Sequence, residues 1–537
     1  MGTSEEGEAL SIKGQPEIRI NGEVIILSIE LDRVSLAMEL VDVGDKSTCL
    51  ETPITSPCQH VDYCNCSELT GSQVQLPEDI LHRIHALMPM QDAAQAACVS
   101  SDFLRSWRSY PKLILCMDSL GIKEDSAKKD EITRDFIGRV EQIMQNHSGM
   151  GVKKFSLQTY PCSDLHPSYV DHWLQIAAKL GIEELELLMF GHGDIKYNFP
   201  CSFLSSEWQS SVQSFILGHC SFHSAAQIGC MGSLKFLDLR SVHVTGEELY
   251  GFLSNACALE NLYLSNCKDI TFLKIPHLLQ RLNILHVFGC KNLEMIDSSA
   301  PNLSTFTYAG RPINISLGDA LQVRKVIFRR DYSPDAVYYA STKLPFIAPY
   351  LETLVLSTRH EKVNTPPLFG RFLHLKYLEI QAPAPNFSPD YDFCSLVSFL
   401  DASPTLNTFI LRIEMPTIRA DSIVDASDGD SLHQRCVSER CHDNLKKVMI
   451  TGFCSAKSMI ALTVHIIEKT KSLECLTLDT TRGHDRRYVN IDKCLRLSKD
   501  ALVEAEKALV AIRRYVEGRV PSTLNLKVIE PCSKCIY

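Results

Sequence analysis

The chain of 537 residues has no apolar stretch approaching the roughly 18 residues that cross a bilayer, so no membrane span is predicted. Its first residues are acidic and lack the basic and apolar regions of a secretory signal. Basic residues do not predominate, because 54 Lys and Arg stand against 64 Asp and Glu, for a net charge of −10. That balance argues against a general nucleic-acid-binding protein.

Motifs of common catalytic chemistry are also missing: there is no phosphate-binding loop, zinc-protease helix or nucleophile elbow. We therefore expect no enzymatic activity and no cofactor. Cysteine is abundant, with 21 residues, yet disulfides are not expected without a secretion signal. Most thiols are predicted to be small buried apolar side chains in the nucleus or cytoplasm.

The stretch 74–115 predicts a unit of three short helices. Pro77 suits the first turn of a helix that Pro89 ends, and apolar residues recur between them at spacings of three and four. Asp92 with Gln95 has the pattern of a capping box that opens a second helix. About 40 residues bury little core alone, so the unit is predicted to lean on a partner.

The third helix of this unit begins at Ser100 or Ser101, either of which can cap it. Phe103 and Trp107 then share one face, four residues apart. Acidic and basic residues balance within 74–115, which argues against a helix-turn-helix that tracks phosphates.

The same residues resemble the F-box, the module that docks a protein onto the Skp adaptor of a cullin–RING ubiquitin ligase. The resemblance lies in Leu76-Pro77, Leu87-Met88-Pro89 and Val99-Ser100 with the aromatic residues that come after them. Phe103 stands where the family more often has Trp, and Ala93–Ala97 replaces a bulkier middle. The resemblance implies that the adaptor is contacted by Leu76, Pro77, Ile80, Leu81, Ile84, Leu87, Pro89, Val99, Ser100, Phe103 and Trp107.

Two histidines, His82 and His85, lie three residues apart on the first helix of the unit. No third ligand is near in sequence, so they are predicted to be solvated or to face the adaptor rather than to bind metal.

The residues before the F-box, 1–73, are predicted to be a poorly ordered leader, although 18–43 contains strand-like runs. Cys58, Cys64 and Cys66 gather around His60, which raises the alternative of a zinc site. Their spacing fits none of the usual paired C-x2-C arrangements, so a tail without metal is the preferred interpretation.

Residues 116–150 are predicted to be a linker and one amphipathic helix. Phe136, Val140, Ile143 and Met144 mark its apolar face, which can join the F-box to the rest of the chain.

From 151 to 493 the pattern apolar-x-x-apolar-x-apolar recurs thirteen times, about every 27 residues, which is typical of a leucine-rich repeat. The fold class is therefore α/β: a three-helix F-box followed by a solenoid, a horseshoe with a parallel sheet. The repeats start at Val152, Ile182, Val212, Leu234, Leu259, Leu282, Leu303, Val323, Leu351, Leu375, Leu406, Leu445 and Leu473.

In several repeats a cysteine follows the last apolar position by three residues, at Cys220, Cys267 and Cys290. This matches the Asn/Cys slot of the leucine-rich repeat. A catalytic thiol would be singled out, whereas these recur with the repeat, so a packing role is predicted.

The longest repeat carries a polar stretch, 421–430, that is predicted to be a surface loop. Residues 494–537 are predicted to be a capping helix and tail, the helix starting after Ser498 and covering the open end of the solenoid. Leu524 is a possible start for a fourteenth repeat. Cys532 and Cys535 form a lone C-x2-C, a weak metal signal.

The residues between and beside the inward leucines point to the concave face, where a recruited protein would bind. Apolar side chains are unusual on a solvated strand face, and Arg329 and Arg412 beside them are suited to an acidic or phosphorylated group. The alternative is that loops or a terminal helix cover some of them. The candidate target-binding residues are Arg240, Tyr263, His286, Phe288, Ile327, Arg329, Val355, Ile410, Arg412 and Met449.

The chain resembles plant F-box proteins with C-terminal leucine-rich repeats. The resemblance implies the substrate receptor of a Skp–cullin–F-box ubiquitin ligase, with an unknown target protein and neither nucleic acid nor membrane as partner. The alternative is a leucine-rich-repeat interaction scaffold independent of ubiquitin ligation.

Overall fold

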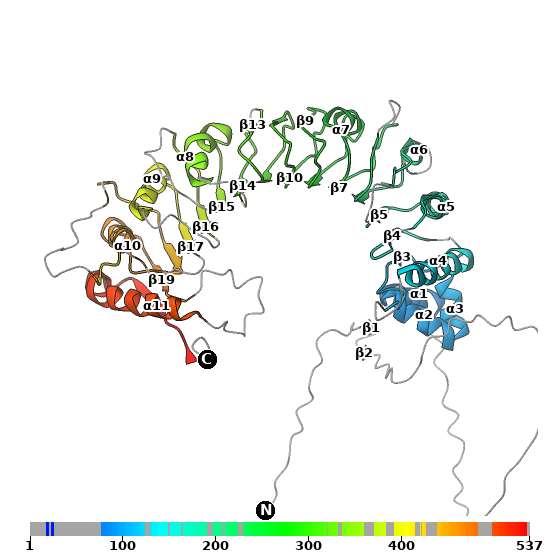
Figure 1. The fold of residues 1–537 in the computed structure, drawn as a ribbon, viewed down its shortest axis with the longest axis horizontal. Coiled ribbons are helices and arrows are strands. Elements are labelled where there is room, and N and C mark those ends of the chain that lie inside the picture. Colours follow the sequence, from blue (N-terminus) through cyan, green and yellow to red (C-terminus); the bar gives the residue numbers. More distant parts are fainter. Residues whose placement is uncertain are drawn as a thin grey trace, which may run out of the picture.

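The computed structural model describes residues 18–20, 23–25, 77–123, 129–148, 151–162, 165–190, 197–205, 208, 210–223, 229–318, 321–330, 336–358, 370–382, 391–413, 419, 421–425, 436, 438–481 and 497–533. These residues form an open arch (Figure 1), with a long sheet on its inner side and most helices on its outer side. The predicted α/β class and solenoid are confirmed.

The main sheet has 15 strands, all parallel, whose order follows the chain. They are β3 (Lys112–Leu115), β4 (Lys154–Gln158), β5 (Glu184–Leu188), β6 (Ser214–Gly218), β7 (Phe236–Arg240), β8 (Asn261–Ser265), β10 (Ile284–Phe288), β12 (Thr305–Ala309), β14 (Lys325–Arg330), β15 (Thr353–Thr358), β16 (Tyr377–Ala382), β17 (Thr408–Ile413), β18 (Lys447–Thr451), β19 (Cys475–Asp479) and β20 (Asn525–Ile529).

Each of the thirteen predicted repeats supplies one of these strands, from β4 to β19. The sheet extends beyond the predicted range 151–493 at both ends, with β3 before it and β20 after it. β3 pairs with β4 through Leu113 and Leu115, which are fully buried, and so belongs to the sheet although it falls within the F-box range. β20 confirms the irregular last repeat at Leu524.

The outer side of the arch is built partly from strands in its middle and from helices elsewhere (Figure 1). Three short parallel strands, β9 (Phe272–Ile275), β11 (Met295–Ser298) and β13 (Asn314–Ser316), form a second sheet there. The helices are α1 (Glu78–Leu87), α2 (Met90–Val99), α3 (Ser101–Trp107), α4 (Lys129–Asn146), α5 (Pro167–Ala178), α6 (Ser202–Ser205), α7 (Gly246–Leu253), α8 (Ala336–Ile347), α9 (Val397–Ala402), α10 (Lys457–Lys469) and α11 (Lys499–Ala511).

Most strands of the main sheet alternate buried and accessible residues, as the apolar-x-apolar pattern requires. In β4, β7, β12, β16 and β19 the third residue is buried as well. Leu237, Leu262 and Leu285 are in register on neighbouring strands and are almost completely buried, so their side chains stack into one continuous core. Within the described residues, no helix is both long and apolar enough to span a membrane.

The chain turns out of four consecutive strands through residues with positive φ: His219, Ser241, Asn266 and Gly289. Each donates its backbone N–H to the carbonyl at the end of the next strand, at 2.6–2.8 Å. The turns therefore continue the hydrogen-bond ladder one residue beyond the sheet, which keeps neighbouring coils in register.

The F-box helices are joined to the solenoid by packing. Met90 of α2 is buried, and its sulfur accepts a hydrogen bond from the backbone N–H of Ile114 in β3 at 3.2 Å. The predicted linking helix is α4, whose four marked apolar residues are all buried. Phe136 of α4 meets Trp173 of α5 edge-on, with ring centroids 6.4 Å apart.

The predicted terminal helix is α11, with Ser498 as its cap, but it does not cover the open end of the solenoid. It lies on the outer side, near α10 (Figure 1), and leads from β19 to β20, which is the last strand of the sheet. The covering expectation was wrong because β20, whose residues all stay partly or fully exposed, continues the sheet after α11, so this helix connects two strands instead of ending the solenoid.

A buried carboxylate ties α11 to its neighbours. Glu504 is fully buried, and one oxygen accepts bonds from the backbone N–H and hydroxyl of Ser455, both at 2.7 Å. The other accepts from the backbone N–H of Arg419 at 3.0 Å. Part of the predicted surface loop, 421–430, is therefore buried, since Ser422 and Ile423 are each only 3% exposed. Residues 426–430 of this loop lie outside the described residues.

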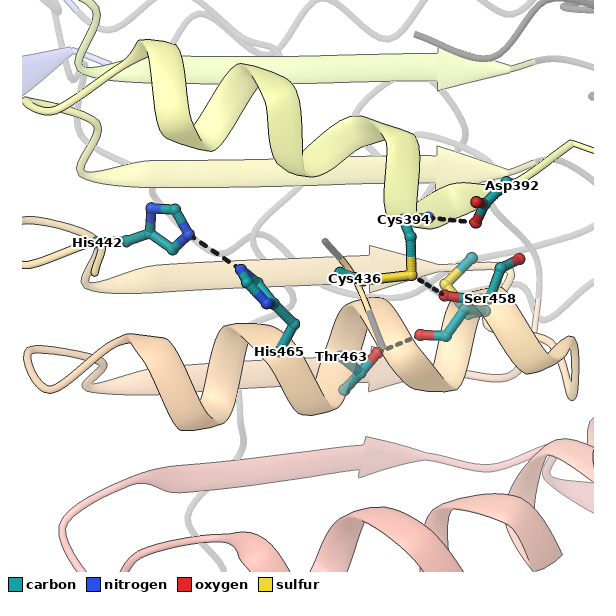
Figure 2. Close-up of a disulfide and its surroundings, with 8 residues drawn as sticks. Asp392, Cys394, Cys436, His442, Ser458, Thr463 and His465 are labelled. Atoms are coloured by element: carbon teal, nitrogen blue, oxygen red, sulfur yellow. Dashed lines mark hydrogen bonds between the residues drawn. A yellow bond between two sulfur atoms is a disulfide. The ribbon is translucent and has the colours of Figure 1, made fainter. Parts of the chain in front are cut away.

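The expectation that cysteines stay reduced is not met at one place. Cys394 and Cys436 form a disulfide with Cα atoms 5.2 Å apart, beside α10 (Figure 2). The repeat cysteines behave as predicted: Cys220, Cys267 and Cys290 are unpaired and buried. Burial raises the pKa of Cys220 to about 12, so its thiol stays protonated and packs as an apolar group.

Before the F-box, Ile18–Ile20 (β1) and Glu23–Ile25 (β2) pair antiparallel, so this strand-like segment has a partner that the sequence did not reveal. The rest of 1–73, including Cys58, Cys64, Cys66 and His60, lies outside the described residues. Cys535 does too. Among described residues, no three His, Cys, Asp or Glu side chains are grouped to hold a metal.

Candidate interaction surfaces

The three-helix unit forms as predicted, with one difference in how α2 begins. Ser100 caps α3 by accepting a hydrogen bond from the N–H of Phe103 at 3.4 Å. The expected capping box is wrong, because α2 starts at Met90 and places Asp92 inside its first turn. Ala93, Ala96 and Ala97 are buried, so the small residues of α2 allow close helix packing.

His85 is a core residue of the unit and does not face solvent or a partner. Its side chain is fully buried; Nδ1 lies 2.9 Å from the hydroxyl of Ser106 in α3, and Nε2 lies 2.8 Å from the carbonyl of Ala93 in α2. Burial lowers the pKa of His85, so the neutral ring is favoured. One imidazole thus connects all three helices, and the prediction of a solvated or adaptor-facing His85 was wrong.

The predicted adaptor-binding residues fall into two groups. Ile84 and Trp107 are each 8% exposed and form the unit's own core, which corrects their assignment as contact residues. Leu76 lies outside the described residues. Four of the others are exposed, namely Pro77, Leu87, Pro89 and Val99, and four are partly exposed, namely Ile80, Leu81, Ser100 and Phe103.

Two of these side chains are unusually exposed for apolar residues. Leu87 at the end of α1 is 62% exposed, and Val99 at the end of α2 is 85% exposed. Both side chains are at helix ends of the three-helix unit, where they are accessible to a protein partner.

On the concave face, the ten predicted target-binding residues lie in two parallel rows. The middle row, at the third position of each strand, includes Tyr263, His286, Ile327, Val355, Ile410 and Met449, each partly exposed. The outer row lies two residues further along each strand. It includes Arg240, Phe288, Arg329 and Arg412.

Two of the three predicted arginines are already paired. Arg240 donates to Asp238 through Nε at 2.9 Å and Nη2 at 2.7 Å, a pair that sequence reasoning placed on one face but did not connect. Arg412 donates through Nε to Glu379 at 2.7 Å, and its side chain is only 13% exposed. Arg412 is therefore not available for its predicted role of binding an acidic group of a target.

Glu379 is the centre of a polar network on the face. Burial favours its neutral form, but hydrogen bonds from Tyr377, Arg412 and Gln381 outweigh it and hold the pKa of Glu379 below its usual range. A buried carboxylate with these partners stays ionised and fixes Arg412 in place. The sequence signal for it was a charged residue in a row of apolar ones.

The middle of the face is aromatic and basic. Tyr263 and His286 stack, with ring centroids 5.3 Å apart and planes inclined by 27°. Burial, and after it the charge of Arg329, lower the pKa of His286. Arg329 is exposed, and its described contacts include no carboxylate.

Comparison with known proteins separates two regions of the chain. Residues 74–115 match the F-box domain, and residues 143–533 match the leucine-rich-repeat domain of the At1g61320/AtMIF1 type. The second match covers more than half of the chain. The protein belongs to the F-box/leucine-rich-repeat family.

Relatives of this F-box/leucine-rich-repeat protein occur in Arabidopsis thaliana. F-box/LRR-repeat protein At3g58940 is 26% identical over 44% of this chain and 39% of its own length. Putative F-box protein At3g58860 is 24% identical over 44% of this chain, and the match spans 50% of that relative. Putative F-box/FBD/LRR-repeat protein At5g56810 is 24% identical over 80% of this chain and 94% of its own length.

Among solved structures, a leucine-rich repeat protein from Bacteroides ovatus matches 65% of this chain and 84% of its own, at 12% identity. Its TM-score of 0.13 is too low for the two shapes to be compared.

Proposed function

We propose that the protein is the substrate-recognition subunit of a Skp–cullin–F-box ubiquitin ligase. The F-box binds the Skp adaptor, and the concave face of the solenoid binds the target protein. The observation that carries this proposal is the exposed apolar surface of Leu87 and Val99 on a unit that matches the F-box.

In this role the protein performs no chemistry itself. It raises the local concentration of a target lysine near a ubiquitin-charged enzyme, and the rate gain comes from proximity. We place the protein in the nucleus or cytoplasm, with neither nucleic acid nor membrane as a partner.

Co-purification with a Skp adaptor tests the proposal. Leu87→Asp and Val99→Asp place charges on exposed positions, so they are expected to abolish adaptor binding without unfolding the unit. Leu278→Asp is the matched control, because Leu278 is 60% exposed but lies in the solenoid, in the turn before β10. It is expected to retain the adaptor.

The alternative is a scaffold whose helical unit serves a different protein. If the wild-type chain never recovers the adaptor, or if Leu87→Asp and Val99→Asp keep it, the ligase role is wrong and the scaffold is favoured.

A further inference from the structure

The concave positions of β12, β14 and β15 form a cationic surface in the middle of the solenoid. We define this central cationic surface by Thr305, Thr307, Ala309, Lys325, Ile327, Arg329, Thr353, Val355 and Ser357, which are in register on three adjacent strands. It contains two cations and no acidic residue. The concave positions of these three strands therefore carry positive charge that no acidic residue of the same positions neutralises.

The acidic residues on either side of this surface are engaged elsewhere. Toward the amino-terminal end, Asp238 is 5% exposed and bonded to Arg240. Toward the carboxyl-terminal end, Glu379 is 1% exposed and bonded to Arg412. Neither carboxylate bonds Arg329, and among the described residues no other carboxylate pairs with its exposed guanidinium.

The neighbours of Arg329 leave room beside it. In the outer row it stands between Ala309 and Ser357, both small and both almost fully buried. The next position toward the amino-terminal end is Phe288, whose ring is partly exposed. A planar carboxylate can thus approach the guanidinium along its fork, the geometry in which Arg donates two parallel hydrogen bonds.

In the middle row of the concave face, apolar side chains lie next to Arg329. Ile327 lies between Lys325 and Arg329 on β14, and Val355 is its partly exposed neighbour on β15. Residues at alternate positions of a strand lie about 6–7 Å apart. A bound segment therefore meets cation, apolar contact and cation in succession over about 13 Å.

We propose that the central cationic surface binds an acidic segment of the target protein, with an Asp or Glu carboxylate on Arg329 and an apolar side chain against Ile327 and Val355. The identification of the ligand as a target segment rests on the proposed function. A carboxylate fits better than a phosphoryl group, because one guanidinium matches one negative charge, and His286 nearby favours its neutral form.

Selection from a peptide library tests this with the full chain, purified in the presence of a Skp adaptor. The probe is an immobilised library of nine-residue peptides, randomised over the natural amino acids except Cys, with phosphoserine included at one position. The wild-type chain is expected to enrich Asp or Glu next to an apolar residue. Arg329→Glu is expected to weaken binding of the best acidic peptide about tenfold or more and to shift enrichment toward Lys and Arg.

Arg281→Glu is the matched control, because it makes the same change of charge at an exposed residue outside the concave rows. It is expected to select the same peptides as wild type. The proposal is overturned if Arg329→Glu and wild type select the same peptides, if no acidic residue is enriched, or if phosphoserine is preferred over Glu.

Adaptor recovery is measured on the same preparations and separates this inference from the proposed function. Loss of the adaptor with acidic selection intact contradicts the ligase role and supports the binding surface. Adaptor recovery without acidic selection supports the ligase role and overturns the binding surface.

Discussion

At the scale of single residues, the decisive positions are polar side chains that occupy apolar stripes. His85, Glu379 and Glu504 are each at most 1% exposed, and each bonds groups that are distant in sequence. The sequence could place them on helices or strands through periodicity. It could not predict their partners, because hydrogen bonds across the fold depend on which residues the coils bring together.

Glu504 allows a direct test of one such network. Glu504→Gln keeps the shape but directs an amide N–H₂ toward groups that are themselves donors, so we expect a loss of about 2–3 kcal/mol in unfolding free energy. Urea unfolding followed by circular dichroism measures it. Glu506→Gln, on an exposed position of the same helix, is the control; equal stability of the two variants would contradict the role of Glu504.

The histidine pair beside the disulfide predicts a loss of stability in acid. Nε2 of His442 lies 3.4 Å from Nε2 of His465 (Figure 2), and burial lowers the pKa of both, that of His465 to about 4. The folded state thus favours the neutral rings. The contribution of the two neutral histidines to the unfolding free energy is fully present above their ordinary pKa of about 6.5. It is lost progressively as the pH falls from there toward 4.

Thermal unfolding midpoints between pH 7.5 and 4.5 check this expectation. His465→Gln is expected to show a smaller fall in midpoint than wild type, because one group that must gain a proton is gone. Other histidines with a lowered pKa, such as His85 and His147, are present in both chains, so their contribution cancels in the comparison. Parallel pH profiles would contradict the assignment.

At the scale of elements, the repeat was predictable and its exceptions were not. The thirteen strands from β4 to β19 carry three apolar positions at fixed spacing, which is a strong signal. The strands β3, β9, β11 and β13 have only three or four residues, too few for a pattern to stand out. The candidate face was predictable for the same reason as the strands, since alternate residues point to opposite sides.

The end of β18 illustrates a constraint on one element. Gly452 has φ of +69°, and a Cβ there would lie 2.0 Å from the carbonyl oxygen of Ile413. Gly452→Ala is expected to destabilise the chain by more than about 1 kcal/mol, because both strain and contact oppose it. Gly251→Ala in α7, where a Cβ meets nothing within 4 Å, is expected to stabilise by a few tenths to about 1 kcal/mol in the same thermal assay. Equal midpoints for the two variants would contradict this.

At the scale of the whole molecule, the F-box and the solenoid share one continuous core. Trp107 of α3, Leu113 of β3 and Phe155 of β4 belong to the same cluster of buried side chains. We therefore expect a fragment of residues 77–123 to lack cooperative unfolding in circular dichroism, whereas the full chain unfolds cooperatively. A fragment that unfolds cooperatively at the midpoint of the full chain would contradict a shared core.

The placement of β3 in the main sheet has a consequence for the geometry of ubiquitin transfer. Because β3 pairs with β4 directly, the F-box region and the strands that would hold a target are parts of one sheet in the described part of the chain. Each further strand adds about 4.8 Å along the sheet, so the coil that grips the target sets its distance from the adaptor. In the proposed complex, the number of strands between the F-box and the bound segment therefore sets the distance from the adaptor to the target. That distance determines which lysine of the target can receive ubiquitin.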